Sequence, residues 1–216
     1  MTGDWIDDNR ISYDTVAEAY AEQVRDALAG QPHLLAALAV FAEAVRAGGG
    51  GPVADMGCGP GHVTAHLRGL GVDAFGVDVS PAMVGVARRD HPGLRFEAGS
   101  MTDPQLAGAP LGGLLSWWSL VNVPDDAVPG ILAGFGRPLR PGAPLLLGFH
   151  AGEGARPKTE GYGGHPMQIH VYRRVPERVA GWLRGAGFAV EAQWLLDPDE
   201  QRPSAVLFAR AAAPRP

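Results

Sequence analysis

The order of apolar and polar positions along the chain predicts an alternation of strands and helices. Short apolar runs indicate strands, and stretches in which apolar residues recur every three or four positions indicate amphipathic helices. The expected strands lie at residues 52–56, 72–77, 94–98, 113–117 and 145–150, and the expected helices lie at residues 14–29, 32–47, 63–70, 81–89 and 125–139. Such alternation is typical of a parallel sheet covered by helices on both faces.

The chain after the fifth expected strand departs from this alternation. Residues 151–168 are rich in Gly, Pro and charged residues without a regular period, and a segment of that length is often a functional lid. A helix is expected at 175–186, followed by strands at 188–195 and 204–210 with only a charged turn between them. Two strands joined directly predict an antiparallel hairpin at one edge. We therefore expect an α/β fold with a doubly wound, mostly parallel seven-stranded sheet and an antiparallel C-terminal hairpin.

Composition and charge restrict the organisation of the chain and its partners. With 216 residues, of which 46% are hydrophobic, the chain is long enough for one substantial core, so a single domain is expected. The formal net charge is -5 and the Lys and Arg residues are scattered, which argues against a nucleic-acid substrate. The longest apolar runs, such as residues 143–149, are far shorter than the roughly 20 residues that span a bilayer, so no membrane partner is expected.

Two further features indicate the compartment. The N-terminal residues 1–8 are acidic, whereas a signal peptide begins with a basic and then an apolar segment. Cys58 is the single cysteine, so neither an internal disulfide nor a zinc cluster is expected. We expect a cytoplasmic protein without a metal site.

A glycine-rich loop follows the first expected strand and leads into a helix. Gly57, Gly59 and Gly61 leave backbone groups and the helix N-terminus open to a ligand at the carboxyl edge of the sheet, and Asp55 adds a carboxylate beside them. Such a loop alone would also suit NAD, FAD or simple turn geometry. The sequence therefore predicts a ligand at this edge without identifying it.

The ends of the next two expected strands narrow the choice of ligand. Asp78 stands at the tip of the second strand, where its carboxylate can accept hydrogen bonds from both hydroxyls of a ribose. Gly99, Ser100 and Met101 follow the third strand, where a hydroxyl or an amide can meet an adenine edge and a thioether can lie along its face. Three successive strand ends therefore indicate a nucleoside.

These residues carry a family resemblance. Residues 53–61 resemble the signature of class I S-adenosylmethionine-dependent methyltransferases, an apolar strand followed by Asp/Glu-x-Gly-x-Gly-x-Gly. Residues 76–83 are similar to the ribose-binding segment of that family, residues 139–143 to the turn before its fifth strand, and residues 116–124 to its fourth-strand motif. The resemblance extends from about Tyr13 to the end of the chain, and the richness in Ala, Gly, Pro and Arg resembles actinobacterial proteins of this type.

The resemblance implies S-adenosylmethionine as the cofactor and assigns its contacts. Backbone groups of the glycine loop hold the methionine part, the first carboxylate meets its ammonium, and the second holds the ribose. The implied cofactor-binding residues are Tyr13, Asp55, Gly57, Cys58, Gly59, Asp78, Val79, Met83, Gly99, Ser100, Met101 and Trp117, the last through its carbonyl. Ser100 departs from the family pattern, in which an Asp commonly meets the adenine amino group.

The resemblance also implies a division of the single methyltransferase domain 1–216. Residues 1–50 form an N-terminal helical cap, residues 51–150 the cofactor-binding core, and residues 151–170 a lid over the substrate.

Methyl transfer from a sulfonium is an in-line displacement, so the protein mainly aligns the acceptor with the methyl group and excludes water. A hydroxyl or carbon acceptor needs a base, and histidine suits that role near neutral pH. We expect His165, within the lid, as the catalytic base. His150 and His170 are the other candidates for the base. Trp118, Asn122 and His150 are the expected substrate contacts, and Trp118, His150 and His170 also have a purely structural interpretation.

The acceptor is expected to be a small molecule, a secondary metabolite, methylated on oxygen, nitrogen or carbon by a monomer or homodimer. One alternative is an NAD(P)-dependent oxidoreductase, although the third glycine, Gly61, comes one residue earlier than Gly-x-Gly-x-x-Gly requires. Another is a protein that binds the cofactor without catalysis, or uses it in a step other than methylation.

Overall fold

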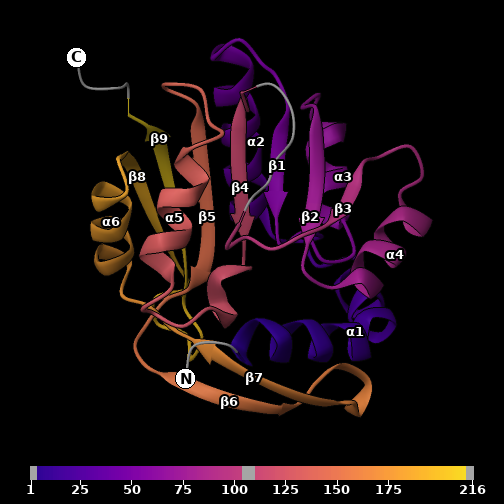
Figure 1. The fold of residues 1–216 in the computed structure, drawn as a ribbon. Helices are drawn as coiled ribbons and strands as arrows, with labels where there is room; N and C mark the ends of the chain where they lie inside the picture. Colours follow the sequence, from indigo (N-terminus) through magenta and orange to yellow (C-terminus); the bar gives the residue numbers. More distant parts are fainter. Residues whose placement is uncertain (1–3, 104–109, 213–216) are drawn as a thin grey trace.

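A seven-stranded sheet lies at the centre of the structure in the order β3-β2-β1-β4-β5-β9-β8 (Figure 1). The structure is a computed structural model that describes residues 4–103 and 110–212, so residues 1–3 of the acidic N-terminal segment lie outside it. The parallel strands are β1 (Val53–Met56), β2 (Ala74–Asp78), β3 (Phe96–Ala98), β4 (Gly113–Trp117) and β5 (Pro144–His150). Antiparallel β9 (Ser204–Ala211) lies between β5 and β8 (Phe188–Leu196). The predicted fold class, including its C-terminal hairpin, is confirmed.

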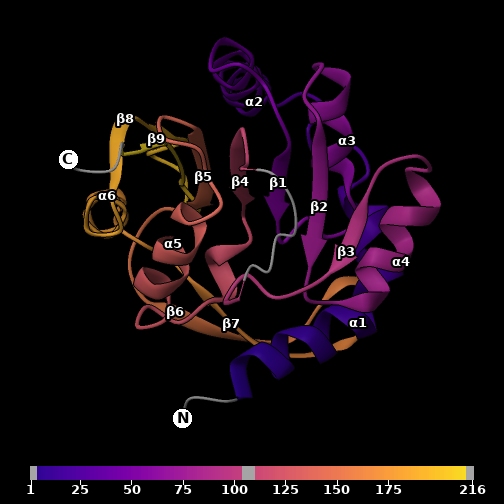
Figure 2. The same cartoon turned by 45° about the horizontal axis from the view of Figure 1, so that its top comes forward.

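Helices cover both faces of this sheet (Figures 1 and 2). One face packs against α2 (Pro32–Ala47) and α3 (His62–Gly69), the other packs against α5 (Val128–Gly136) and α6 (Pro176–Gly185), and α4 (Pro81–Asp90) lies against β2 and β3. Every residue of β1 and β2 is buried, because parallel strands in the middle of such a sheet bury both faces. The continuous apolar runs in the sequence follow from this double burial.

A third group of elements lies across the carboxyl ends of the parallel strands (Figure 1). It consists of α1 (Asp4–Val24) and a two-stranded antiparallel hairpin, β6 (Ala155–Glu160) and β7 (Pro166–Tyr172), joined through the short 3-10 turn η2 (Tyr162–Gly164). Buried residues of α1 and β7 form one apolar cluster with Met83 of α4. The edge of the sheet at which the parallel strands end is therefore covered by α1 and the hairpin, which we call the roof.

The hairpin corrects the expectation of an irregular segment at 151–168. Met167 and Ile169 are buried, whereas Gln168 and His170 are exposed, so β7 has the period of two that a strand with one buried face requires. That alternation is present in the sequence, but the glycines and prolines around it obscured it.

Other boundaries also differ from expectation. The first helix begins at Asp4 rather than at residue 14. The region expected as one helix at 125–139 contains the shorter α5, and the 3-10 turn η1 (Leu120–Asn122) precedes it. The expected cap of residues 1–50 contributes to two layers, because α1 crosses the strand ends while α2 covers a face of the sheet. Within the described residues, none of the helices combines the length and apolar character needed to cross a membrane.

Candidate active site

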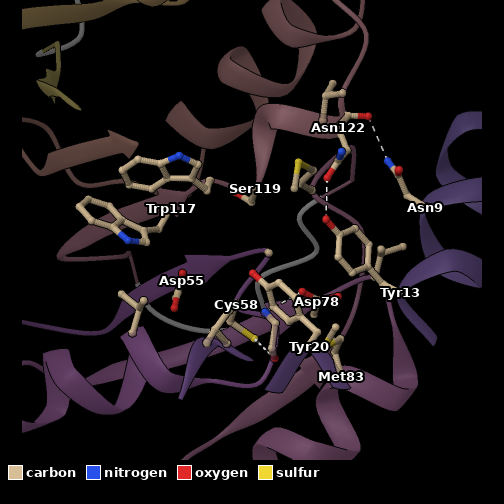
Figure 3. A pocket seen from close by; sticks show the side chains of 18 of the residues that line it. Asn9, Tyr13, Tyr20, Asp55, Cys58, Asp78, Met83, Trp117, Ser119 and Asn122 are labelled. Carbon is tan, nitrogen blue, oxygen red and sulfur yellow. Dashed lines mark hydrogen bonds between the residues drawn. The ribbon is translucent and has the colours of Figure 1, made fainter. Parts of the chain in front are cut away.

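A cavity of about 250 Å³ lies between the strand ends and α1. Figure 3 shows side chains from α1 and from the ends of β1, β2 and β4 pointing into one space. Besides every residue of the predicted cofactor site, the lining includes Trp118, Ser119, Asn122 and Val123 on one side, Trp5, Ile6 and Asn9 from the start of α1, and Tyr20, Val24, Ala27, Leu28, Leu34, His62 and Val63. The structure thus brings all twelve predicted cofactor residues together.

The glycine loop turns tightly at the end of β1. Gly57, Gly59 and Gly61 all have positive φ angles, of 77°, 53° and 82°, which favour glycine, and a Cβ atom at Gly57 would overlap the side chain of Ser119. The N–H groups of Gly57 and Cys58 donate to the carbonyl of Val77, at 2.7 and 3.1 Å. These N–H groups therefore hold the loop onto β2, and the loop offers a ligand its carbonyl oxygens and the space left by the absent side chains.

Asp55 is the last-but-one residue of β1 and is almost fully buried, with 1% of its surface exposed. Its Oδ2 accepts a hydrogen bond from the Thr64 hydroxyl at 2.6 Å, whereas Oδ1 has no donor among the described residues. Burial raises the pKa of Asp55 to about 7, the bond from Thr64 opposes that rise, and the charge of Asp78 adds to it. A buried carboxylate oxygen without a donor fits a cationic ligand group.

Asp78 ends β2 and connects the glycine loop to the start of α4. Its Oδ2 accepts from the Gly59 N–H at 2.8 Å and its Oδ1 from the Ser80 N–H at 2.9 Å. Burial raises the pKa of Asp78, and these two bonds, from Ser80 first and then from Gly59, oppose the rise. Each carboxylate oxygen keeps a further lone pair, so Asp78 can still accept from the two hydroxyls of a ribose.

The lining next to Asp78 suits a flat base. Val79, Met83, Gly99, Ser100 and Met101 all border the cavity there. The hydroxyls of Ser100 and Thr102 form a hydrogen bond of 2.7 Å, so the polar group at this edge is small and neutral. Apolar side chains and a thioether supply the rest of the surface, as expected for an adenine.

Two tyrosines of α1, Tyr13 and Tyr20, border the cavity (Figure 3). The Tyr13 hydroxyl donates to Asn122 Oδ1 at 2.8 Å, and Tyr20 contacts Tyr162 of the hairpin edge-to-face, with ring centroids 4.6 Å apart. Burial, and then the charges of Tyr162 and Asp78, raise the pKa of Tyr20. The sequence prediction named Tyr13 and gave Tyr20 no role, although a spacing of seven residues places both on one face of a helix.

The end of β4 forms an aromatic wall. Trp117 and Trp118 pack edge-to-face with ring centroids 4.8 Å apart. Trp118 has a positive φ of 51°, its N–H donates to Gly148 O at 2.8 Å, and a Cβ atom on Gly148 would collide with its ring. A strained backbone of this kind persists only where its surroundings fix it, and it often marks a functional site.

Asn122 connects three elements while it borders the cavity. Its side-chain amide donates to the His170 carbonyl of β7 at 2.9 Å, its Oδ1 accepts from Tyr13, and its backbone carbonyl accepts from Asn9 at 3.1 Å. One amide hydrogen and one lone pair of this side chain are left for a ligand. His170 itself is exposed on β7, which agrees with a structural interpretation of that residue.

Two predicted histidines lie outside the lining. His150 ends β5 behind Trp118, whose indole N–H donates to His150 Nδ1 at 3.3 Å. Burial, with the charges of Arg173, Arg156 and Arg202, lowers the pKa of His150 to about 4. His150 therefore supports the wall rather than contacting the cavity.

His165 is exposed in the turn that leads into β7 and does not border the cavity. The sequence placed His165 in a lid over the substrate, but the side chain is exposed in the turn before β7. His165 therefore does not border the site of the reacting groups in this structure, and we do not propose it as the base.

Sequence reasoning missed a buried arginine that shapes the site. Arg174 is 2% exposed, donates to the carbonyls of Leu120 and Val123, and forms an ion pair with Asp125 at 2.8 Å. It therefore holds the η1 turn that carries Asn122. No local motif marks this role, because the partners lie about fifty residues away in the sequence.

Comparison with known proteins agrees with this geometry. Residues 53–142 match the model of a family described as Methyltransferase domain. Over 101 residues the chain is 33% identical to the N-demethylindolmycin N-methyltransferase of Streptomyces griseus, a match that covers 44% of this chain and 43% of that relative. The chain spans less than half the length of the curated relatives it matches.

Solved structures show the same fold over nearly the whole chain. Magnesium protoporphyrin IX methyltransferase from Synechocystis PCC 6803, with bound S-adenosylmethionine, has a TM-score of 0.74 at 18% identity and covers 98% of this chain and 99% of its own. The 1,6-didemethyltoxoflavin-N1-methyltransferase of Burkholderia thailandensis, with 1,6-didemethyltoxoflavin and S-adenosylhomocysteine, has a TM-score of 0.68 at 22% identity and covers 97% and 90%.

The segment that matches the Methyltransferase domain family covers less than half of the chain and contains most of the strand-end site, and the fold is that of solved S-adenosylmethionine-dependent methyltransferases. Solved structures of this fold contain S-adenosylmethionine or S-adenosylhomocysteine, which supports the predicted cofactor, and the donor set around Asp55 and Asp78 fits S-adenosylmethionine.

Proposed function

We propose that this protein transfers the methyl group of S-adenosylmethionine to a small planar molecule, a secondary metabolite. The observation that carries the proposal is the continuity of one cavity from Asp78, through the glycine loop and Asp55, to the wall of Trp117 and Trp118. If the nucleoside part of the cofactor lies at Asp78, its methyl-bearing sulfur lies toward the tryptophan wall, where the same cavity has space for the acceptor.

The residues of the chain act by binding, orienting and excluding water. When bound, S-adenosylmethionine supplies a methyl group whose bond to sulfur breaks as an acceptor lone pair forms the new bond to carbon, leaving the neutral thioether. Asp78 accepts from the ribose hydroxyls, and Asp55 Oδ1 accepts from the ammonium. Tyr13 and Tyr20 of α1 border the cavity, and β7 packs against α1, so both elements help to keep water from the acceptor.

The acceptor side of the lining favours an uncharged aromatic ring. Trp5, Ile6, Trp118 and Val123 supply apolar surface, and Asn9 and Asn122 supply neutral polar groups. Among the described residues of this side, none is a histidine or a carboxylate that would serve as a base. A nitrogen acceptor suits such a lining best, since an unprotonated amine needs no base. The names of similar proteins leave the acceptor atom open, because they include two N-methyltransferases and a magnesium-protoporphyrin O-methyltransferase.

Thermal shift measurements separate this proposal from the alternatives. S-adenosylmethionine and S-adenosylhomocysteine should raise the melting temperature, whereas NAD should not. Stabilisation by NAD alone would favour an oxidoreductase. Asp78→Ala should weaken S-adenosylhomocysteine binding roughly 10- to 100-fold, because a charged hydrogen-bond acceptor is removed. Asp73→Ala, an exposed carboxylate just before β2, is the matched control.

Activity separates catalysis from binding alone. The protein should methylate members of a panel of nitrogen-containing aromatic compounds and release S-adenosylhomocysteine in equal amount. Tight cofactor binding without methylated product from any aromatic N, O or C acceptor would favour a non-catalytic or non-methylating role.

A further inference from the structure

The charges that line the cavity are unbalanced for an amino-acid ligand. The lining contains the carboxylates Asp55 and Asp78, and its described residues include neither Lys nor Arg. The methionine part of the cofactor carries a carboxylate as well as an ammonium. Desolvating that carboxylate without a partner would be costly, so the site needs donors for it.

The glycine loop does not provide these donors. The N–H groups of Gly57 and Cys58 donate to Val77, the Gly59 N–H donates to Asp78, and the Gly61 N–H donates to the Cys58 carbonyl at 3.1 Å. The next N–H groups in the chain begin α3.

The start of α3 has donors to offer. His62, Val63 and Thr64 are its first three residues, and their N–H groups have no acceptor among the described residues. The N-cap of this helix is Gly61, which has no side chain to cap it. The N-terminus of a helix favours negative charge.

His62, the first residue of α3, and Asp55, near the end of β1, both line the cavity at this helix start. The Thr64 hydroxyl donates to Asp55, which leaves the buried Asp55 Oδ1 without a donor, as an ammonium would require. His62 lines the same cavity and its Nδ1 is buried without a partner. Among the described lining residues, His62 is also the one side chain that can become a cation.

We propose that His62, together with the free N–H groups at the start of α3, binds the carboxylate of the cofactor's methionine part while Asp55 binds the ammonium. This inference rests on the proposed function, because it assigns a further residue of the same cofactor site. Burial, and then the charge of His91 on the connection between α4 and β3, lower the pKa of His62 to about 4. A carboxylate bound beside the ring would oppose both effects, because a negative charge favours the protonated imidazole.

Calorimetric titration with two ligands tests this assignment. The ligands are S-adenosylhomocysteine and its decarboxylated analogue, which keeps the amine and lacks only the carboxylate. His62→Ala should weaken binding of S-adenosylhomocysteine roughly 10- to 100-fold and leave binding of the decarboxylated analogue unchanged. His62→Gln, which keeps a donor, should recover part of the loss. His66→Ala, one turn later on α3 and outside the lining, is the matched control and should bind as the wild type does.

Each other outcome has a distinct meaning. Equal losses for both ligands, or no loss for either, would overturn the role of His62 in carboxylate binding while the proposed function stands. If the wild-type protein bound neither ligand, the proposed function itself would fail and the inference with it.

Discussion

The carboxylate of Asp14 accepts a hydrogen bond from the hydroxyl of Ser80 at 2.6 Å and another from the Ala82 N–H at 3.1 Å. Ser80 is the N-cap of α4, where its hydroxyl oxygen also accepts from the Met83 N–H, and it lies two residues after Asp78. The roof helix α1 is thus fixed to the helix that borders the ribose end of the site. The position of α1 and the geometry of the cofactor site around Asp78 therefore depend on each other.

Replacing Asp14 should therefore affect stability and cofactor binding together. Asp14→Ala removes two hydrogen bonds to a charged, partly buried group, so we expect a loss of about 1–3 kcal/mol in the free energy of unfolding. S-adenosylhomocysteine affinity should also fall, because Tyr13 and Tyr20 are carried by the same helix. Urea unfolding and calorimetry measure the two effects. Asp7→Ala, which removes an exposed carboxylate of α1, should change neither quantity. A loss of stability with unchanged affinity would mean that the position of α1 does not influence cofactor binding.

Asp55 should make stability and binding depend on pH in opposite directions. Folding raises its pKa from 3.8 to about 7, so the folded chain keeps a proton that the unfolded chain releases. The stability from this group is therefore fully present below about pH 4 and is lost as the pH rises through 7. Affinity for the cofactor ammonium should increase over the upper part of that range, as the carboxylate ionises.

Asp55→Asn removes this titration and keeps an acceptor for the Thr64 hydroxyl. Unfolding measured between pH 4 and pH 8 should therefore show the variant gaining stability relative to the wild type as the pH rises, since only the wild type loses the contribution of the protonated carboxyl. Parallel pH profiles for the two proteins would mean that Asp55 titrates at its ordinary pKa.

Arg174 should be essential to the stability of the acceptor side. Arg174→Met removes the guanidinium donor to the carbonyls of Leu120 and Val123, of which Leu120 keeps a bond from the Val123 N–H, so we expect a loss of about 2–4 kcal/mol and a reduced turnover. Arg178→Met is the matched control, because Arg178 contacts the same Asp125 from an exposed position, at 3.4 Å, and should cost less than about 1 kcal/mol. Equal losses in the two variants would mean that the ion pairs with Asp125, rather than the bonds to the η1 turn, account for the lost stability.

His165 should be dispensable for turnover. A general base contributes about 100-fold or more to the rate, whereas an exposed residue outside the cavity contributes little. We therefore expect His165→Ala to keep nearly the wild-type turnover and cofactor affinity. A large fall in turnover with unchanged affinity would instead restore His165 as the base and require the hairpin turn to move into the cavity.

The cofactor half of the site was predictable because its signals are local. Asp55, Gly57, Asp78 and Met101 follow strand ends in a fixed order, and parallel strands bring those ends to one edge. The strand ends indicated a nucleoside, and the resemblance then implied the sulfonium cofactor. The apolar pattern was sufficient to locate the seven strands of the sheet along the chain.

The acceptor half was less predictable because long-range contacts build it. Tyr13 and Asn122 are 109 residues apart in sequence, and nothing near either residue reveals their hydrogen bond. The direction of His165 depends on the twist and register of the hairpin rather than on the residues around it. His62 had a local signal, its place directly after the loop, but a histidine at a helix start also reads as an exposed residue.

The lining of the cavity divides between the segment that matches the family and elements outside that segment. The residues that meet the cofactor lie mainly between positions 55 and 101, inside the segment that matches the family, whereas α1 and the hairpin lie outside that segment. Substitutions at the start of α1 can therefore change the choice of acceptor while the contacts to the methyl donor at the strand ends stay the same. The choice of acceptor and the binding of the methyl donor are thus separable properties of this chain.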